Sequence, residues 1–493
     1  AITADALAFD GRDVLAMGRR ELRRLRGGEI GFVFQNPHHS LNPLLTVGRQ
    51  LSEAMVAHMG LSQRAARERA AELLARVGIP DPRRRLEDYP HQFSGGMLQR
   101  AMIAMAIACN PSVLIADEPT TALDVTIQAE IIDLLRRLQS DTGMGIMFIT
   151  HDMGVVAEIA DEVAVMHNGR VVERGEPLDI FERPQEPYTQ RLLEAVRRLD
   201  TPSERRLAMR AANPPTGAAL EVENLAKHFY ITGGFLGMSK ETFVAVRDAT
   251  LTLRSGENLG IVGESGSGKT TLGRCIQGVQ RPTDGKVVYT DKNGRTTDLA
   301  RLRESELREA WRDIRMVFQD PFSSLNPRMT VGQIVGEPLL MAGTHSGAEL
   351  RRKVGELLEV VGLPASAAER YPHEFSGGQR QRIGIARAIA PEPRVIIADE
   401  ATSALDVSLR IQVLDLLLEL QERMNLSFLF ISHDIAVIRY FCDRIIVMHR
   451  GRIVETGETE AVCTNPSHDY TRSLLSAVPV PDPRMRGKIV RHR

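Results

Sequence analysis

The sequence lacks any long hydrophobic run. No apolar stretch among its 493 residues reaches the roughly 18 residues that a membrane-spanning helix needs. The longest candidate, residues 101–116, is interrupted by Asn110 and Pro111. We therefore expect a cytosolic chain that meets a membrane only through partner proteins.

Cysteines are also scarce. The four that occur are Cys109, Cys275, Cys442 and Cys463, which lie far apart and form no C-x-x-C pair. Metal sites and disulfide frameworks need cysteines at closer or more regular spacing. We expect four reduced thiols in a reducing compartment, rather than metal ligands.

Neither sign of charge is in excess. The 62 Lys and Arg residues nearly balance the 63 Asp and Glu residues, which gives a net charge of −1. This balance gives no support to a nucleic-acid partner, because proteins that bind nucleic acid present a basic surface. We interpret the basic clusters at residues 19–26, 83–85 and 484–493 as solvated faces or loose ends.

What the sequence does contain is a glycine-rich segment between an apolar run and a helical pattern. Residues 263–270 read GESGSGKT and fit the phosphate-binding pattern G-x-x-x-x-G-K-[ST]. The glycines let successive backbone N–H groups turn inward at a helix N-terminus, where the helix dipole favours an anion. Lys269 would reach the β- and γ-phosphates, and the Thr270 hydroxyl would bind Mg²⁺. This segment predicts a nucleotide phosphate site.

The second feature is a long internal repeat, which predicts two homologous domains. The segments FVFQNP, SLNP, YPHQFSGG, VLIADEP and FITHD, which begin at residues 32, 40, 89, 113 and 148, return as MVFQDP, SLNP, YPHEFSGG, VIIADEA and FISHD, which begin at residues 316, 324, 371, 395 and 430. The Asp follows the Ser-Gly-Gly serine by 23 positions and precedes the His by 34 positions in both copies.

The repeat sets the expected domain boundaries. The expected parts are a first domain at 1–200, a Pro-containing linker at 201–218, a second domain at 219–480 and a basic tail at 481–493. Aligning Gln35 with Gln319 indicates that the first copy lacks an opening stretch of about 66 residues, which would hold its phosphate loop. Because Ala1 is not an initiator residue, we expect a fragment of a native chain with two phosphate loops. Without its opening stretch, the first copy could hardly fold its central sheet.

Each copy alternates β-branched apolar runs with helical patterns. Runs such as residues 113–116 and 163–166 are typical of a mostly parallel sheet covered by helices, with functional residues at the carboxyl ends of the strands. Helical stretches at residues 63–77 and 348–361 indicate an inserted helical subdomain in each copy. The predicted fold class is α/β.

Together these motifs resemble the ATP-binding subunits of ABC transporters, and more narrowly the fused two-domain subunits of oligopeptide/dipeptide importers. The resemblance covers residues 1–480 and rests on the fixed order of the phosphate loop, Gln, Ser-Gly-Gly, Asp-Glu and His motifs. The narrower assignment rests on the Ser-Leu-Asn-Pro, Tyr-Pro-His-x-Phe and (Pro/Asp)-Tyr-Thr segments. The resemblance implies tandem P-loop NTPase domains. Each would have a RecA-like, mostly parallel sheet core, an antiparallel β subdomain and an inserted helical subdomain.

The resemblance implies roles for residues of the second copy. Asp399 would hold Mg²⁺ together with Thr270, and Glu400 would activate the attacking water. His433 would sense the γ-phosphate, and Gln319 would contact Mg²⁺ or the water. Either Phe229 or Tyr230 would stack on adenine. The residues expected around the phosphates of ATP are Gly263, Glu264, Ser265, Gly266, Ser267, Gly268, Lys269, Thr270 and Thr271.

The first copy carries matching residues, and the family implies that the two halves pair head-to-tail. Its catalytic and metal-binding residues would be Gln35, Asp117, Glu118 and His151, with Asp117 and Gln35 at the metal. The helix tip formed by Ser94, Gly95 and Gly96 would cap the ATP at Lys269. The mirror site would be capped by Ser376, Gly377, Gly378 and Gln379. Met97 replaces the family's usual Gln. Because the Ser-Gly-Gly core that would face phosphate is kept, we expect activity to survive, and the effect of Met97 on the Lys269 site stays open.

The implied function is ATP hydrolysis that drives import of peptides or related small solutes. The partners would be two transmembrane permease subunits and, indirectly, an extracytoplasmic solute-binding protein, with the chain peripheral at the cytoplasmic face of the cell membrane. Apolar residues within 37–59 and 321–341 would form grooves for the permeases. The alternative is a soluble tandem ABC ATPase that acts on ribosomes or nucleic acid, which the short linker and the lack of zinc-spaced cysteines disfavour.

The transported substrate stays open at this point. Dipeptides, longer peptides, glutathione, opines and nickel complexes all fit the resemblance, because selectivity lies in the binding protein and the membrane subunits. Some members of the family hold an iron–sulfur cluster near the C-terminus, but Cys463 stands alone there and predicts none.

Overall fold

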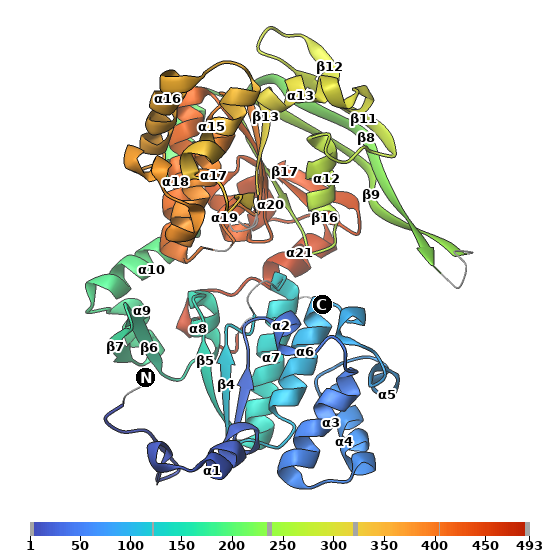
Figure 1. The fold of residues 1–493 in the computed structure, drawn as a ribbon, viewed down its shortest axis with the longest axis vertical. Coiled ribbons are helices and arrows are strands. Elements are labelled where there is room, and N and C mark those ends of the chain that lie inside the picture. The colour runs from blue at the N-terminus through green and yellow to red at the C-terminus, as the bar shows by residue number, and fades with distance from the viewer. Residues whose placement is uncertain (1–3, 121–122, 234–238, 319–323, 404, 489–493) are drawn as a thin grey trace. The chain divides into compact units, whose positions relative to one another are not determined.

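The chain forms two units, which are shown as ribbons in Figure 1 and are described separately below. The computed structural model describes residues 4–120, 123–233, 239–318, 324–403 and 405–488. Unit 1 consists of Ala1–Val163, Gly175–Leu178 and Pro479–Lys488, and unit 2 of Ala164–Arg174, Asp179–Val478 and Ile489–Arg493. Unit 2 therefore contains the second copy of the repeat together with the last segments of the first copy.

Unit 1 places a parallel sheet beside a helical subdomain. Its helices and strands are β1 (Ala8–Phe9), β2 (Arg12–Asp13), α1 (Arg19–Arg24), β3 (Ile30–Val33), α2 (Pro37–Ser40), α3 (Val47–Met59), α4 (Gln63–Arg76), α5 (Pro82–Arg85), α6 (Gly95–Ala106), β4 (Val113–Asp117), α7 (Val125–Thr142), β5 (Gly145–Ile149) and α8 (Met153–Ile159). The sheet order is β3-β4-β5, and both pairings are parallel. The core joins the sheet to the subdomain through fully buried side chains such as Leu51, Met55, Leu74 and Leu98.

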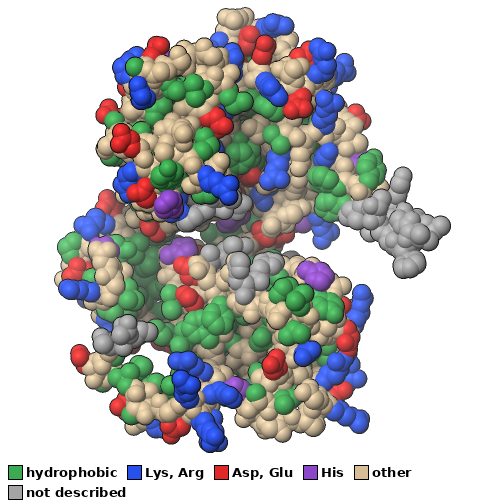
Figure 2. All heavy atoms as spheres, in the orientation of Figure 1, with side chains coloured by type: hydrophobic (Ala, Val, Ile, Leu, Met, Phe, Trp, Pro, Cys, Tyr) green, Lys and Arg blue, Asp and Glu red, His purple; other side chains and the backbone are tan. Residues whose placement is uncertain are grey.

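One face of the sheet in unit 1 is uncovered. Phe32, Ile115 and Met147 are register partners on β3, β4 and β5, and Phe32 and Met147 are 38% and 58% exposed. Figure 2 shows hydrophobic side chains at the surface over this sheet. The second copy buries the matching register partners, which include Met316 and Leu429, against α12 (Lys269–Ile276). The described part of the first copy contains no counterpart of that helix.

Unit 2 holds a complete repeat. Its elements from the first copy are β6 (Val163–His167), β7 (Arg170–Gly175), α9 (Pro177–Glu182), α10 (Pro187–Leu199) and α11 (Glu204–Ala212). Those of the second copy, besides α12, are β8 (Thr216–Gly233), β9 (Ser239–Ser255), β10 (Asn258–Val262), β11 (Asp284–Thr290), β12 (Thr296–Asp298), α13 (Glu304–Asp313), β13 (Ile314–Val317), α15 (Val331–Met341), α16 (Gly347–Val360), α17 (Gly377–Ile389), β14 (Val395–Asp399), α18 (Val407–Met424), β15 (Ser427–Ile431), α19 (Ile435–Phe441), β16 (Arg444–His449), β17 (Arg452–Glu458), α20 (Thr459–Thr464) and α21 (Asp469–Ser476).

The central sheet of unit 2 has the strand order β13-β14-β15-β10-β16-β17 and is parallel except for the last pair. A second, antiparallel sheet has the order β12-β11-β8-β9. Strands β10, β14 and β15 are buried on both faces, as expected for parallel strands that helices cover on either side. This arrangement confirms the predicted α/β fold, with its parallel core and antiparallel subdomain. In the first copy, by contrast, β5 and β6 belong to separate sheets, whereas β10 joins their counterparts β15 and β16 in the second copy.

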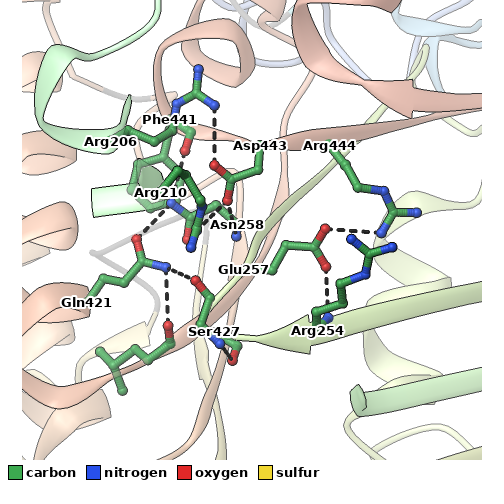
Figure 3. Close-up of polar contacts among 12 residues, drawn as sticks. Arg206, Arg210, Arg254, Glu257, Asn258, Gln421, Ser427, Phe441, Asp443 and Arg444 are labelled. Carbon is green, nitrogen blue, oxygen red and sulfur yellow. Dashed lines mark hydrogen bonds and ion pairs between the residues drawn. The ribbon is translucent and has the colours of Figure 1, made fainter. Parts of the chain in front are cut away.

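The segment between the copies is a helix anchored to unit 2. Arg206 and Arg210 lie four residues apart on one face of α11, and both contact the carboxylate of Asp443 (Figure 3). Asp443 directly precedes β16, and it also accepts the backbone N–H of Asn258, the first residue of β10, at 2.8 Å. Helix α11 is therefore fixed to the amino edge of the central sheet. The prolines of this segment suggested only a short linker, and β8 already begins within it at Thr216.

Replacing Asp443 by Ala is expected to lower the free energy of unfolding of unit 2 by about 3–5 kcal/mol. Arg206 and Asp443 are only 4% and 8% exposed, so the change leaves buried positive charge without its partner. Trp311 is the only tryptophan of the sequence and belongs to unit 2. Its fluorescence during urea unfolding of the full chain measures the effect.

The matched control is Glu422→Ala. Glu422 pairs with Arg205, which also lies on α11, but both side chains are about half exposed. Glu422→Ala is therefore expected to lower the free energy of unfolding by only about 0–1 kcal/mol. Equal unfolding midpoints for the two variants would contradict a buried anchor at Asp443.

Charged side chains of both signs are interspersed over the visible surface of each unit, in line with the net charge near zero (Figure 2). Within the described ranges, every helix is too short or too polar to cross a lipid bilayer.

Candidate active site

The predicted site residues of the second copy gather at the carboxyl edge of the central sheet. The phosphate loop follows the last residue of β10, Asp399 ends β14, and His433 comes two residues after β15. Because these strands are parallel neighbours, with Asp399 and Ile261 both in register with Ile431, their carboxyl ends meet at one edge. Sequence reasoning placed these residues at strand ends, and the structure brings them together.

Two glycines of the phosphate loop occupy positions where a side chain has no room. Gly263 has φ +150° and Gly268 has φ +100°. A Cβ atom would lie 2.1 Å from the Met448 carbonyl oxygen at the first position and 2.3 Å from the Ala245 carbonyl oxygen at the second. The loop can therefore take this shape only with glycine at both places, and α12 begins directly after it.

The polar groups of the loop fit a phosphate chain with a hard cation. Lys269 is 5% exposed, and its Nζ donates to the carbonyl oxygens of Gly263 at 2.6 Å and Glu264 at 2.8 Å. The buried Ser267 hydroxyl has no hydrogen-bond partner among the described residues. Thr270 Oγ1 donates to Asp399 Oδ1 at 3.2 Å, which places a hydroxyl and a carboxylate side by side, and oxygen donors of this kind suit Mg²⁺. Within the described chain, no group of three or more His, Cys, Asp or Glu side chains could hold a metal ion.

Glu400 and His433 form an ion pair, with His433 Nδ1 3.2 Å from Glu400 Oε1. Burial pushes the pKa of Glu400 upward, but the hydrogen bond and the charge of His433 outweigh it, so this pKa lies below its ordinary value. Burial also pushes the pKa of His433 downward, and the Glu400 partner reverses this effect and raises it. Burial raises the pKa of Asp399, with the Glu400 charge adding to the effect and the Thr270 hydrogen bond opposing it. The contact with His433 thus favours the carboxylate form of Glu400.

Glu400 has a left-handed backbone, with φ +49°. Its N–H donates to the Ile431 carbonyl oxygen at 2.9 Å, which holds the residue at the sheet edge. Glu118 in the first copy has φ +44° and makes the same bond to Ile149. Unusual backbone conformations that persist in a fold concentrate at functional sites. This backbone conformation was not predicted from the sequence.

The first copy brings together three of its four predicted residues. Gln35 Nε2 donates to Glu118 Oε2 at 2.6 Å, and His151 Nδ1 lies 3.0 Å from Glu118 Oε1. Asp117, the last residue of β4, directly precedes Glu118. Gln319, the counterpart of Gln35 in the second copy, lies outside the described residues.

Both Ser-Gly-Gly segments begin helices, as predicted. Ser94 caps α6 by accepting the Met97 N–H at 3.3 Å, and Ser376 caps α17 by accepting the Gln379 N–H at 3.4 Å. The Gln379 side chain also accepts the Ser376 N–H at 3.0 Å, a return bond that the thioether of Met97 does not supply. A Cβ atom at Gly95 or Gly377 would meet nothing within 4 Å, whereas one at Gly96 or Gly378 would press on Ile127 or Leu409.

The two aromatic candidates for adenine lie on β8. Phe229 pairs with Phe243 of β9, and Lys227 Nζ lies 5.2 Å from the centre of the Phe229 ring. Tyr230 is 66% exposed. Successive strand residues point to opposite faces, so only one of the two can face a given nucleotide.

One residue next to the phosphate loop was not predicted as a site residue. The Glu264 N–H donates to the Tyr470 hydroxyl at 3.0 Å. The available signal was the Tyr-Thr pair at Tyr188 and Tyr470, which the sequence analysis interpreted only as a mark of the family.

Comparisons with known proteins identify the family of the chain. The family model "ABC transporter" matches residues 2–121 and 246–403. The family model "Oligopeptide/dipeptide transporter, C-terminal region" matches residues 172–226 and 454–493. Together they confirm the resemblance drawn from the sequence.

Curated relatives extend the match to most of the chain. The glutathione import ATP-binding protein GsiA of Salmonella typhi is 48% identical over 481 residues, which cover 94% of this chain and 76% of the relative. The same protein of Escherichia coli strain K12 is 47% identical over 495 residues, or 96% of this chain and 78% of the relative. A solved dimeric ATP-binding cassette, in a post-hydrolysis state with ADP and Pi, is 33% identical over 49% of this chain and 98% of its own, with a TM-score of 0.43.

The combined matches place both copies in one family and their C-terminal segments in one branch of it. The chain is an ATPase that belongs to the ABC transporter family, as an ATP-binding subunit of the oligopeptide/dipeptide importer type.

Proposed function

We propose that this chain supplies the energy for import of glutathione or short peptides through two transmembrane permease subunits. The observation that carries the proposal is the single sheet edge where Lys269, Asp399 and the Glu400–His433 pair meet, in a chain 47–48% identical to proteins named for glutathione import. The chain would lie at the cytoplasmic face of the membrane, where ATP is available and the permeases present their inner loops.

In the proposed site, the Lys269 ammonium leaves the two loop carbonyls that it now contacts and meets the β- and γ-phosphates of ATP. The Ser267 hydroxyl and the N–H groups from Gly266 to Thr271 provide further donors. Mg²⁺, held by Thr270, Asp399 and phosphate oxygens, would neutralise charge that develops on the phosphates. Gln319 would contact this cation or the water.

Glu400 is the proposed general base for the attacking water. Its lowered pKa keeps it ionised at neutral pH, and its left-handed backbone directs it beyond the end of β14. His433 orients Glu400 through Nδ1, while its other ring nitrogen would meet the γ-phosphate. In the first copy, Glu118, His151 and Gln35 form the matching group, with Asp117 beside them at the metal.

We also propose that each site is completed by the helix tip of the opposite half. The open space at Gly95 and Gly377 leaves both tips accessible to a phosphate. Ser94, Gly95 and Gly96 would cap the ATP at Lys269, and Ser376, Gly377, Gly378 and Gln379 would cap the mirror site. ATP would then hold the two halves together until it is hydrolysed.

Exposed apolar side chains after each Gln motif support contact with the permeases. Leu44 is 82% exposed in the first copy, and Leu340 and Met341 are 52% and 77% exposed at the end of α15. Isolated side chains of this kind need no partner, but each of these lies in the segment that follows the Gln motif of its own copy. They are the proposed docking points for cytoplasmic helices of the two membrane subunits.

Transport by the reconstituted importer tests the proposal. Vesicles that contain the chain and its membrane partners, with the solute-binding protein outside, should take up labelled glutathione in an ATP-dependent manner, and Lys269→Ala should abolish this uptake. Unlabelled glutathione should compete better than a dipeptide or a tetrapeptide. Stronger competition by a dipeptide would assign the chain to peptide import, and uptake that persists in Lys269→Ala would refute the proposed mechanism.

A further inference from the structure

The C-terminal helix α21 makes a direct hydrogen bond to the phosphate loop. The hydroxyl of Tyr470, its second residue, accepts the Glu264 N–H at 3.0 Å. This N–H and the Gly263 carbonyl belong to the same peptide group, and the Gly263 oxygen accepts from Lys269 Nζ at 2.6 Å. One peptide at the start of the loop is therefore held from both ends, by Lys269 on one side and by Tyr470 on the other.

The surrounding contacts hold Tyr470 in place. Its ring lies 4.0 Å, centre to centre, from the ring of His449, the last residue of β16. Burial and the neighbouring Arg450 lower the pKa of His449, so the ring is neutral at pH 7 and packs without burying a charge. Glu455 of β17 accepts the N–H groups of Ser467 at 2.7 Å and His468 at 3.1 Å, which fixes the turn that leads into α21.

The same framework occurs in the first copy. Glu173 accepts the N–H groups of Gln185 at 2.7 Å and Glu186 at 3.3 Å, ahead of α10. The Tyr188 ring stacks on His167 with a centre-to-centre distance of 4.0 Å. The first copy thus repeats the carboxylate, the turn and the stacked rings. Among the described residues, this group of contacts forms there without a phosphate loop beside it. The hydrogen bond to Glu264 is what distinguishes Tyr470 from Tyr188.

We propose that Tyr470 is a positioning residue for ATP binding at Lys269. This inference rests on the proposed role of the phosphate loop. When ATP draws the Lys269 ammonium away from the Gly263 carbonyl, the Tyr470 hydroxyl still holds the N–H end of that peptide. The hydroxyl thereby keeps the loop in the conformation that binds the phosphates. Its loss should affect ATP binding more than the hydrolysis step.

Tyr470→Phe removes only the hydroxyl and tests the inference. In the full chain with its membrane partners, we expect the KM for ATP to rise about fivefold, the effect of one neutral hydrogen bond, with kcat within about twofold of the parent. The thermal unfolding midpoint should not change, because the Phe ring still packs on His449. ATP titration in a Glu400→Gln background should show the same fivefold loss of affinity.

Tyr188→Phe, made in a chain of residues 1–493, is the matched control, because it removes the equivalent hydroxyl where the described residues place no phosphate loop, and its KM should equal that of the parent. An unchanged KM in Tyr470→Phe, or an equal rise in Tyr188→Phe, would overturn the inference. Lys269→Ala, measured in parallel, separates the two proposals. If Lys269→Ala loses ATP binding and Tyr470→Phe does not, only the positioning role fails, whereas unchanged binding in Lys269→Ala overturns both.

Discussion

Glu400→Gln is expected to lower kcat for ATP hydrolysis by about 10²–10⁴-fold while ATP still binds. The amide keeps the size of the side chain and its place beside His433, but it cannot accept a proton from the attacking water. The contact at 3.2 Å with His433 and the lowered pKa both favour the carboxylate form of Glu400, which is the protonation state that a general base needs. Steady-state phosphate release and ATP titration on the same sample measure the two effects separately.

Two further variants make this experiment specific. Glu118→Gln is combined with Glu400→Gln, because the first copy carries a matching Gln35–Glu118–His151 group that could turn over ATP independently. Glu392→Gln is the matched control, since Glu392 also has a left-handed backbone, with φ +56°, but it precedes the amino end of β14, whereas Glu400 follows the carboxyl end, and it pairs with Lys353 of α16. Full activity is expected for Glu392→Gln. Parent-like kcat in the Glu118→Gln and Glu400→Gln double variant would rule out Glu400 as the base.

Lys269→Ala is expected to weaken ATP binding by about 10²-fold, since it would remove the proposed charge-assisted hydrogen bonds to phosphate. The loop itself should persist, because Gly263 and Gly268 still allow its shape and the Tyr470 hydroxyl still accepts the Glu264 N–H. Equilibrium titration with ATP measures the affinity, and circular dichroism checks the fold.

Lys286→Ala serves as the control for loss of one positive charge. Lys286 lies on β11, is half exposed and pairs with Glu223, so its removal should leave the affinity for ATP unchanged. Equal affinities in Lys269→Ala and Lys286→Ala would contradict phosphate binding by residues 263–270.

The sequence analysis located those site residues whose surroundings are formed by neighbours in the chain. An apolar run, a glycine-rich turn and a helix follow one another within about 20 residues, so the phosphate loop was located together with its strand and helix. Asp399 and His433 were placed at strand ends for the same reason. That these ends meet follows from parallel pairing, which the alternation of strands and helices indicated.

The features that escaped prediction depend on partners distant in the chain. Arg206 meets Asp443 across 237 positions, and Tyr470 meets Glu264 across 206 positions. No local pattern marks such a pair, so the segment with α11 was interpreted as a linker and the segment with Tyr470 only as a mark of the family. The left-handed backbone of Glu400 also escaped, because side-chain type says little about φ where the surrounding fold imposes it.

The conformation shared by Glu118 and Glu400 has a consequence for engineering. A residue with a Cβ atom loses roughly 1 kcal/mol in the left-handed region, which glycine enters freely. A design protocol that selects for stability alone would therefore replace both glutamates by glycine. The resulting protein would be more stable but would lack the proposed bases. At these two positions the chain retains a carboxylate at the expense of thermodynamic stability, and that compromise is expected where activity has been selected over robustness.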